Sequence, residues 1–146
     1  MLGAVALFWL DSRLRNRAPQ LRCEADQMLL AVAAAGALPH VFKRMIDRKR
    51  PDRVVVHGRR RGIPRSGNAW DSFPSGHALH IGAIAGPLLR VVPRQARAPL
   101  GAGLLALAAS RIWLLAHYAS DVAAGLLLGA GLGKVVQKLV LRWPRR

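Results

Sequence analysis

The sequence has one cysteine and few acidic residues, and each shortage excludes a class of protein. Cys23 has no partner thiol, so an internal disulfide and a cysteine-rich metal site are both excluded. We interpret Cys23 as an ordinary interfacial residue. Asp and Glu number 7 against 23 Lys and Arg, which gives a net charge of +16 at pH 7.

The basic chain is also apolar. Hydrophobic residues make up 52% of the sequence, and the mean hydropathy is +0.19. A soluble nucleic-acid binder would rarely be so apolar, so no nucleic-acid partner is predicted. The composition fits a membrane protein whose cations lie in loops and face phosphates. The length, residues 1–146, predicts a single membrane-embedded domain.

Apolar stretches alternate with basic ones, which predicts an all-α, polytopic membrane bundle of about four to five helices. A spanning helix needs about 20 apolar residues. The expected helices cover residues 1–10, 28–42, 78–92, 99–116 and 122–141. The last two are long enough to span, as is the second if it extends over 25–45, whereas 78–92 is a short or tilted span. Residues 1–10 are interpreted as a stub, either a short natural helix or the tail of a longer one. Gly125, Gly129 and Gly133 are spaced for close helix packing.

Three polar segments are predicted to meet at one membrane face. If the spans alternate in direction, the second ends where the third begins, around the basic loop 48–73, and the fourth ends where the fifth begins. All four ends then lie on one side. Both faces are basic, so the positive-inside rule does not decide which side this is. The basic loop is interpreted as an active-site loop, and Arg59 to Arg65 within it as a binding region for head groups or the anionic membrane surface. Trp9, Trp70 and Trp143 are interpreted as interface anchors.

The first segment contains Lys43, Asp47 and Arg50-Pro51. In a helix the three charged residues would share one stripe, so a solvated, salt-bridged helix end is one interpretation. Pro51 disfavours helical backbone at Arg50. The alternative is a pair of cations, Lys43 and Arg50, presented to phosphate oxygens.

The second segment is Pro74-Ser75-Gly76-His77. Ser75 is a good N-cap and Gly76 a turn residue, so a capped helix explains it structurally. A helix N-terminus also offers free N–H groups to an anion, and Gly76 lets a phosphate approach the backbone. His77, in the first turn, would reach the same anion.

The third segment contains Ser110-Arg111, His117 and Asp121. Ser110, His117 and Asp121 form one stripe if the helix continues, and a buried polar stripe between membrane helices indicates function unless it is a packing network. Asp121 is predicted to accept a hydrogen bond from one ring nitrogen of His117, which leaves the other to attack phosphorus. Arg111 carries a planar fork suited to phosphate.

The remaining histidines His40, His57 and His80 are interpreted as packing or supporting residues. Their spacing and the lack of acidic partners argue against a zinc site, so no metal and no cofactor are predicted.

The three segments resemble the signature of the type 2 phosphatidic acid phosphatase superfamily, which also includes the vanadium haloperoxidases. That signature is Lys, six residues, Arg-Pro; then Pro-Ser-Gly-His; then Ser-Arg, five residues, His, three residues, Asp. Every position matches between residues 43 and 121. Membrane members usually have six helices, and this chain departs from them in its N-terminal part.

The resemblance implies a role for each matched residue. His117 would be the nucleophile that forms a phosphohistidine, Asp121 would orient it, and His77 would be the general acid. The implied phosphate ligands are Lys43, Arg50, Ser75, Gly76 and Arg111.

The sequence therefore predicts a multi-pass lipid phosphate phosphatase of the cell membrane, small and bacterial. Its substrate would be a prenyl phosphate, a prenyl diphosphate or a phosphatidate-like lipid, and its partners that lipid and the bilayer; no oligomeric state is predicted. One alternative is a phosphotransferase or haloperoxidase that uses the same pocket. Another is a non-catalytic membrane protein that binds anionic lipid.

Overall fold

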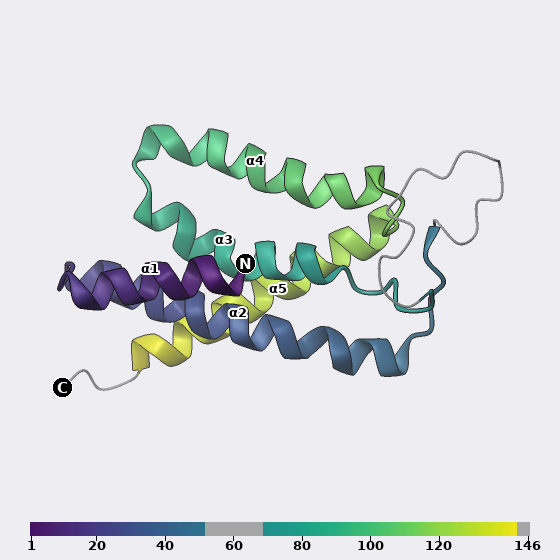
Figure 1. Ribbon diagram of the computed structural model, residues 1–146, viewed down its shortest axis with the longest axis horizontal. Helices are drawn as coiled ribbons and strands as arrows, with labels where there is room; N and C mark the ends of the chain where they lie inside the picture. Colours follow the sequence, from purple (N-terminus) through teal and green to yellow (C-terminus); the bar gives the residue numbers. More distant parts are fainter. Residues whose placement is uncertain (52–68, 143–146) are drawn as a thin grey trace.

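The structure is a computed structural model that describes residues 1–51 and 69–142. Five helices account for most of these described residues, and no strand occurs among them. In chain order they are α1 (Leu2–Leu14), α2 (Pro19–Met45), α3 (Gly76–Val91), α4 (Arg94–Trp113) and α5 (Ala119–Arg142). The predicted all-α bundle of four to five helices is confirmed (Figure 1). Helix α2 begins earlier than the predicted second helix, which was expected to start at residue 28 or 25. Pro19 occupies its first turn.

Helix α3 is the centre of the bundle. It contributes to three separate apolar clusters: one with α2 and α5, one with α1 and α2, and one with α4 and α5. Helix α4 is the most peripheral of the long helices, since Ala108 is its one buried residue. Figure 1 shows α4 running beside α3 and α5 rather than between other helices. The position of α3 fixes where its N-terminal residues, Gly76 and His77, lie relative to every other helix.

Three glycines of α5 allow it to lie against the backbone of α3. A Cβ atom placed on Gly125 would lie 2.6 Å from the carbonyl oxygen of Ser75, and one on Gly133 would lie 2.6 Å from that of Ala83. A Cβ on Gly129 would come closer still to the carbonyl oxygen of Leu79. The predicted close packing of this glycine stripe is confirmed. It sets the register between the helices that carry His77 and Asp121.

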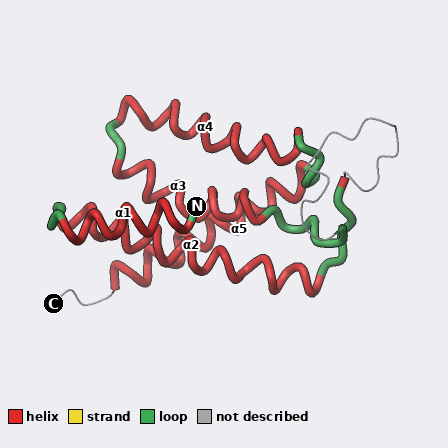
Figure 2. The backbone as a smooth tube through the Cα atoms, viewed as in Figure 1, coloured by secondary structure: helices red, strands yellow, loops and turns green. Residues whose placement is uncertain are grey.

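The long helices run back and forth, so four helix ends meet at one end of the bundle. Figure 1 shows the C-terminal ends of α2 and α4 beside the N-terminal ends of α3 and α5. The connecting segments gathered there are drawn as loops in Figure 2. The convergence predicted from alternating spans is thus present. The central part of the basic loop, including His57 and Arg59 to Arg65, lies outside the described residues, as does Trp143.

A second polar network closes the opposite end of the bundle. Arg90 of α3 donates to both carboxylate oxygens of Glu24 on α2, at 2.7 and 2.8 Å. Trp9 of α1 donates its indole N–H to Asp26 of α2 at 2.8 Å, so Trp9 is bonded within the fold rather than presented only as an interface anchor. These contacts tie the short helix α1 to the bundle.

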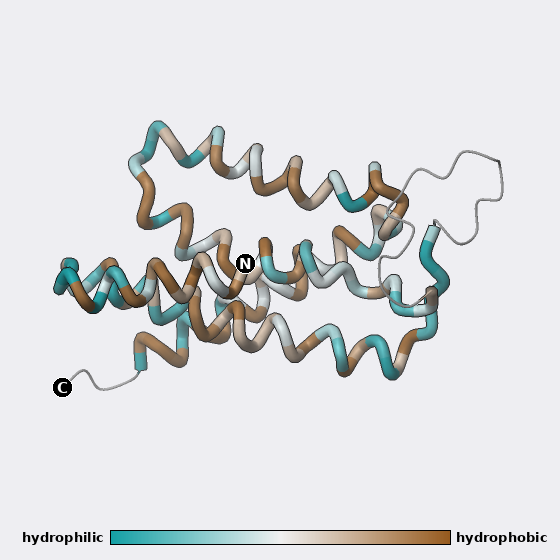
Figure 3. The backbone as a smooth tube through the Cα atoms, viewed as in Figure 1, coloured by the Kyte–Doolittle hydropathy of each residue, from teal (hydrophilic) through white to brown (hydrophobic). Residues whose placement is uncertain are grey.

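Helices α2 and α5 are long and apolar enough to cross a membrane. Helix α4, which was expected to qualify, is not among the candidate spans, because Arg97 and Arg111 interrupt its apolar run. Large apolar side chains nevertheless face outward on several helices, among them Leu30, Leu105, Leu127 and Leu139. Figure 3 shows hydrophobic residues along the middle of the bundle and hydrophilic ones concentrated towards its ends.

Candidate active site

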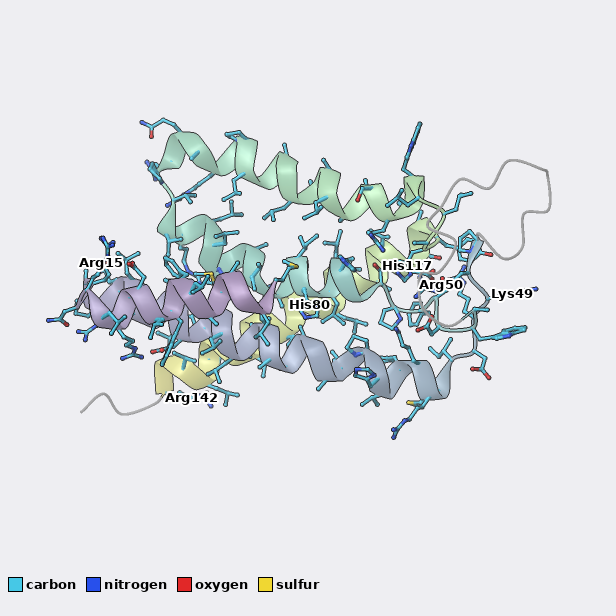
Figure 4. The ribbon with its side chains drawn as sticks, in the orientation of Figure 1. Arg15, Lys49, Arg50, His80, His117 and Arg142 are labelled. Carbon is cyan, nitrogen blue, oxygen red and sulfur yellow. The ribbon has the colours of Figure 1, made fainter. Side chains whose placement is uncertain are left out.

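The site lies at the end of the bundle where the four helix ends meet. In Figure 4, His117 and Arg50 lie close together at this end, whereas Arg15 and Arg142 mark the opposite one. Segments far apart in sequence are joined here by side-chain contacts: Lys43 and Arg50 with Asp71, and Ser72 with both His117 and Asp121. Ser75 of the second segment joins them through its backbone N–H, which donates to the carbonyl oxygen of Asp121, so the three predicted segments form one cluster.

His117 stands on a tight turn between α4 and α5. The backbone N–H groups of Ala116 and His117 both donate to the carbonyl oxygen of Arg111, at 3.1 and 3.2 Å. Leu115 takes a left-handed conformation, with φ of 53°, which non-glycine residues rarely adopt. The helix therefore does not continue from Ser110 to Asp121, so the single stripe, which was expected only for a continuous helix, does not form. The turn instead buries the ring of His117, which is 4% exposed.

The ring of His117 is held by a backbone carbonyl. Its Nδ1 atom lies 2.7 Å from the carbonyl oxygen of Ser72, whereas the nearest oxygen of Asp121 lies 4.0 Å away. The predicted hydrogen bond from His117 to Asp121 is thus replaced by one to Ser72. Because a carbonyl oxygen can only accept, Nδ1 carries the proton and Nε2 carries the lone pair.

Asp121 is a fully buried carboxylate that accepts hydrogen bonds from three donors. Its Oδ1 atom accepts from Arg48 at 2.6 Å, and its Oδ2 atom accepts from the hydroxyl of Ser72 at 2.5 Å and from the backbone N–H of Tyr118 at 3.0 Å. Asp121 therefore ties the turn that carries His117 to the segment that supplies the Ser72 carbonyl. In this arrangement it orients His117 through its neighbours rather than by direct contact.

His117 is neutral at physiological pH. Burial lowers its pKa to about 4, and the positive charges of Arg50 and Arg111 act in the same direction. The Ser72 carbonyl and the Asp121 carboxylate oppose this shift without cancelling it. A neutral imidazole with a lone pair on Nε2 is the form that can act as a nucleophile.

Asp71 holds the two cations of the first segment. Lys43 donates to its Oδ2 atom at 2.9 Å, and Arg50 donates to its Oδ1 atom at 2.9 Å. Burial alone would raise the pKa of Asp71, but the hydrogen bonds and charges of Lys43 and Arg50 lower it below its usual value. Arg50, which is buried, also donates to the carbonyl oxygen of Ala116, next to His117. The Lys43–Arg50 pair is therefore fixed beside the histidine.

The backbone around Arg50 is extended. Helix α2 ends at Met45, and residues 48 and 50 then pair with 69–72 through backbone hydrogen bonds of 2.9 to 3.2 Å. The helical stripe of Lys43, Asp47 and Arg50 does not form, and Asp47 is exposed. Asp71 takes the place that the stripe interpretation gave to Asp47. The paired segments fasten both ends of the basic loop.

The second segment opens α3 as predicted. Ser75 is the N-cap, with its hydroxyl 3.5 Å from the backbone nitrogen of Ala78, and its own N–H donates to the carbonyl oxygen of Asp121 at 3.1 Å. A Cβ on Gly76 would meet only Pro39, at 3.9 Å, so packing within the described residues does not require glycine there. His77 is exposed, in the first turn of α3.

The Nε atom of Arg111 is a buried hydrogen-bond donor. This atom makes no hydrogen bond within the part of the chain that the structure describes. A buried donor without an acceptor is costly, and such groups commonly mark a place where a ligand completes the bonding. The backbone of Arg111 is bonded to that of His117, whose N–H donates to the Arg111 carbonyl oxygen, so Arg111 lies beside the candidate nucleophile.

The other candidates are not part of this cluster. His80 is bonded to the carbonyl oxygen of Gly76 at 2.7 Å, His40 is exposed, and Ser110 donates to the carbonyl oxygen of Leu107 within its own helix. Among residues 1–51 and 69–142, no three His, Cys, Asp or Glu side chains are grouped to hold a metal ion.

Three site residues were missed by sequence reasoning: Arg48, Asp71 and Ser72. The signal for Asp71 was charge balance, since two adjacent cations need a carboxylate and few are present in this chain. No comparable signal existed for Ser72, because its carbonyl is what holds His117 and every residue has one.

The comparisons with known proteins agree with this geometry. The family described as the PAP2 superfamily matches residues 25–145. A lipid A 1-phosphatase of Rhizobium johnstonii is 38% identical over 104 residues, which is 70% of this chain and 42% of that protein. A decaprenylphosphoryl-5-phosphoribose phosphatase of Mycobacterium tuberculosis is 32% identical over 140 residues, 95% of this chain and 68% of that protein. The chain thus spans less than half the length of the lipid A 1-phosphatases it matches.

The fold is also found in a solved structure. The crystal structure of Aquifex aeolicus LpxE superposes with a TM-score of 0.66 at 24% identity, and the match covers 79% of this chain and 67% of that one. At this identity the likeness concerns the arrangement of helices alone.

Proposed function

The chain belongs to the PAP2 superfamily, and from that membership we propose that it is a membrane-embedded lipid phosphate phosphatase that works through a phosphohistidine on His117. The observation that carries the proposal is the state of His117. Its Nδ1 proton is held by Ser72, its ring is neutral, and cations stand beside it. A pure lipid-binding site needs cations but no buried histidine in a fixed tautomer.

The same geometry supports the proposed set of phosphate-binding groups. Lys43, Arg50 and Arg111 supply positive charge. The Nε donor of Arg111, which has no acceptor among the described residues, suits a phosphate oxygen. The cap residue Ser75 and Gly76 add the N-terminus of α3, whose partial positive charge favours an anion. The missing side chain of Gly76, whose Cβ position meets only Pro39 at 3.9 Å among the described residues, supports close approach of a phosphate to the backbone.

In the first step, the Nε2 lone pair of His117 attacks phosphorus and the bond from phosphorus to the lipid oxygen breaks. His77, which is exposed in the first turn of α3, gives a proton to the departing oxygen. The products are a free lipid and a phosphohistidine whose ring is positively charged. The buried carboxylate of Asp121, 4.0 Å from Nδ1, stabilises that charge.

In the second step, a water molecule attacks the phosphohistidine. His77, now neutral, takes a proton from this water while the bond from phosphorus to Nε2 breaks. Inorganic phosphate leaves, and the electron pair returns to Nε2. The proton stays on Nδ1 throughout, hydrogen-bonded to the Ser72 carbonyl oxygen, so His117 ends in the state in which it began.

The proposed location is a membrane that the chain crosses several times. Helices α2 and α5 are long enough to span, and α3 and α4 run between the same two ends of the bundle (Figure 1). The outward apolar side chains of these helices suit lipid. The site then lies at one membrane face, where a lipid phosphate is presented.

The proposed substrate is a phosphomonoester or diphosphate of a membrane lipid. The named relatives act, by their names, on lipid A and on a decaprenyl-linked phosphoribose, so both a glycolipid and a prenyl carrier belong in the test. Phosphate release is measured in detergent with prenyl phosphate, prenyl diphosphate, phosphatidate, a prenyl-linked sugar phosphate and lipid A 1-phosphate. Release from at least one supports the proposal, and binding without release from any of them would identify a lipid-binding protein instead.

A further inference from the structure

Arg48 is a cation of the site that lies among the six spacer residues between Lys43 and Arg50, and it occupies none of the matched motif positions. Its guanidinium donates to Asp121 at 2.6 Å and to the hydroxyl of Ser120 at 2.9 Å. The same group lies 4.4 Å from the centre of the Tyr118 ring, a distance at which cations and aromatic faces attract. All three contacts are made with the residues around the start of α5, one turn from His117.

The backbone of Arg48 is fixed as firmly as its side chain. Its N–H donates to the carbonyl oxygen of Trp70 at 3.2 Å, and its carbonyl accepts from the N–H of Ser72 at 3.0 Å. Ser72 is the residue whose carbonyl holds the His117 ring. Arg48 therefore links the two supports of His117: Ser72 through the backbone and Asp121 through the side chain.

The carboxylate that Arg48 reaches is fully buried, and a buried carboxylate without a paired cation is strongly unfavourable. Arg50 is engaged with Asp71 and the Ala116 carbonyl, and Lys43 with Asp71. Within the described residues, Arg48 is the cation whose ion pair with Asp121 is shorter than 4 Å.

We propose that Arg48 is a positioning residue of the phosphatase reaction, which holds Asp121 and thereby the turn and the ring of His117. This inference rests on the proposed role of His117 as the nucleophile. It assigns Arg48 no contact with the substrate. Loss of Arg48 would free the turn that carries His117 to shift and leave the Asp121 carboxylate without its paired cation.

Removal of the Arg48 charge is expected to favour the protonated form of His117. The charges that face His117 are Arg50 from the extended segment, Arg111 from α4 and Asp121 from α5, with the Ser72 carbonyl on Nδ1. When Arg48 no longer offsets Asp121, the carboxylate favours the protonated ring more strongly. The acid limb of activity, which reports protonation of the nucleophile, then moves to higher pH.

The test compares Arg48→Gln with Lys49→Gln in the full chain in detergent. Lys49 is the matched control: it is the next residue, its loss removes the same charge, and its ammonium lies 5.7 Å from the Trp70 ring rather than on Asp121. Arg48→Gln is expected to lower kcat about 10- to 100-fold with little change in KM, and to raise the pH of the acid limb. Lys49→Gln is expected to keep kcat within about twofold of wild type, as exposed charges usually allow. Arg48→Lys, which keeps the charge, should restore part of the lost kcat.

A second comparison shows whether Arg48 acts through Asp121. In an Asp121→Asn background, adding Arg48→Gln should change kcat less than about twofold, because the partner is already absent. A rise in KM as the main effect of Arg48→Gln would make Arg48 a substrate ligand and overturn the proposal. An acid limb and kcat that match those of Lys49→Gln would overturn it as well. A wild-type chain that releases no phosphate from any lipid would instead contradict the proposed function itself.

Discussion

The Nδ1 atom of His117 lies 2.7 Å from the backbone carbonyl oxygen of Ser72. This contact fixes the tautomer of a histidine whose carboxylate neighbour, Asp121, is too distant for a direct hydrogen bond. A carbonyl oxygen cannot take the proton from the ring. Whenever the ring is neutral, the proton is therefore on Nδ1 and the lone pair is on Nε2. Asp121 is left to stabilise positive charge that develops later.

Replacement of His117 by alanine should abolish phosphate release, because no other described side chain stands in its position against Ser72. The expected loss is at least about 10³-fold in kcat, as for removal of other catalytic nucleophiles. The control is His40→Ala, since His40 is exposed on α2 and should be replaceable without effect. Near wild-type turnover of the His117 variant would rule out the phosphohistidine mechanism.

His117 should titrate well below an ordinary histidine. Its pKa of about 4 lies below the usual 6.5 because the ring is buried and faces Arg50 and Arg111. Between about pH 4 and pH 6.5 the unfolded chain therefore binds a proton at His117 that the folded chain does not bind. Above about pH 6.5 the lowered pKa does not affect the free energy of unfolding, which then decreases as the pH falls from 6.5 towards 4. NMR of histidine-labelled protein in detergent, assigned with the His117→Ala variant, measures this directly. A titration midpoint near 6.5 would contradict the burial of the ring.

Asp71→Asn should weaken phosphate binding. Asp71 is bonded to both Lys43 and Arg50, so the carboxylate holds two like charges at a fixed separation. Without its charge the cations repel each other, and kcat/KM is expected to fall about tenfold or more, mainly through KM. Asp47→Asn, which removes an exposed carboxylate from the same segment, is the control and should leave KM unchanged. Equal KM values in the two variants would show that Asp71 does not position the cations.

Chelation by EDTA should leave activity unchanged. The two carboxylates of the site, Asp71 and Asp121, are already bonded to Lys or Arg, and the charge that a metal would offer to phosphate is supplied by Lys43, Arg50 and Arg111. The measurement is phosphate release with and without EDTA, followed by addition of divalent ions. Loss of activity that a divalent ion restores would require a metal that these residues do not predict.

Sequence order alone was enough to predict where the candidate site lies in the bundle. Alternating spans bring the ends of α2 and α4 to the starts of α3 and α5, and this depends on span count rather than on packing detail. Local geometry was predicted less well. Periodicity suggested that Ser110, His117 and Asp121 share a helical stripe, but the left-handed Leu115 ends that helix and starts a turn. The residue types at this position do not predict such a turn, because leucine ordinarily avoids the left-handed conformation.

Sequence reasoning missed the residues that hold the site in place for a related reason. The proposed phosphate ligands are specified by residue type, whereas Arg48, Asp71 and Ser72 act through tertiary contacts with residues far along the chain. Arg48 and Asp121 are 73 positions apart. Residue spacing within a helix gives no information on contacts of that range, which depend on how α2, α3 and α5 pack.

The glycine stripe of α5 provides a test of that packing. Gly129 lies against the backbone of α3 at Leu79, so a methyl group there would overlap the carbonyl oxygen and force the two helices apart. Gly129→Ala should therefore destabilise the protein, at a cost on the order of 1–3 kcal/mol for overpacking. Its neighbour Gly131 has nothing within 4 Å of the Cβ position, so Gly131→Ala should be neutral or stabilising by up to about 1 kcal/mol through helix propensity.

Thermal unfolding in detergent separates the two glycine variants. The Gly129 variant should unfold at a lower temperature than wild type, and the Gly131 variant at the same or a higher one. Because α3 carries His77 and α5 carries Asp121, the shift between these helices should also lower kcat in the Gly129 variant alone. Equal unfolding temperatures for the two variants would mean that α3 and α5 do not pack through this stripe, and the register between the helices that carry His77 and Asp121 would have to come from other contacts.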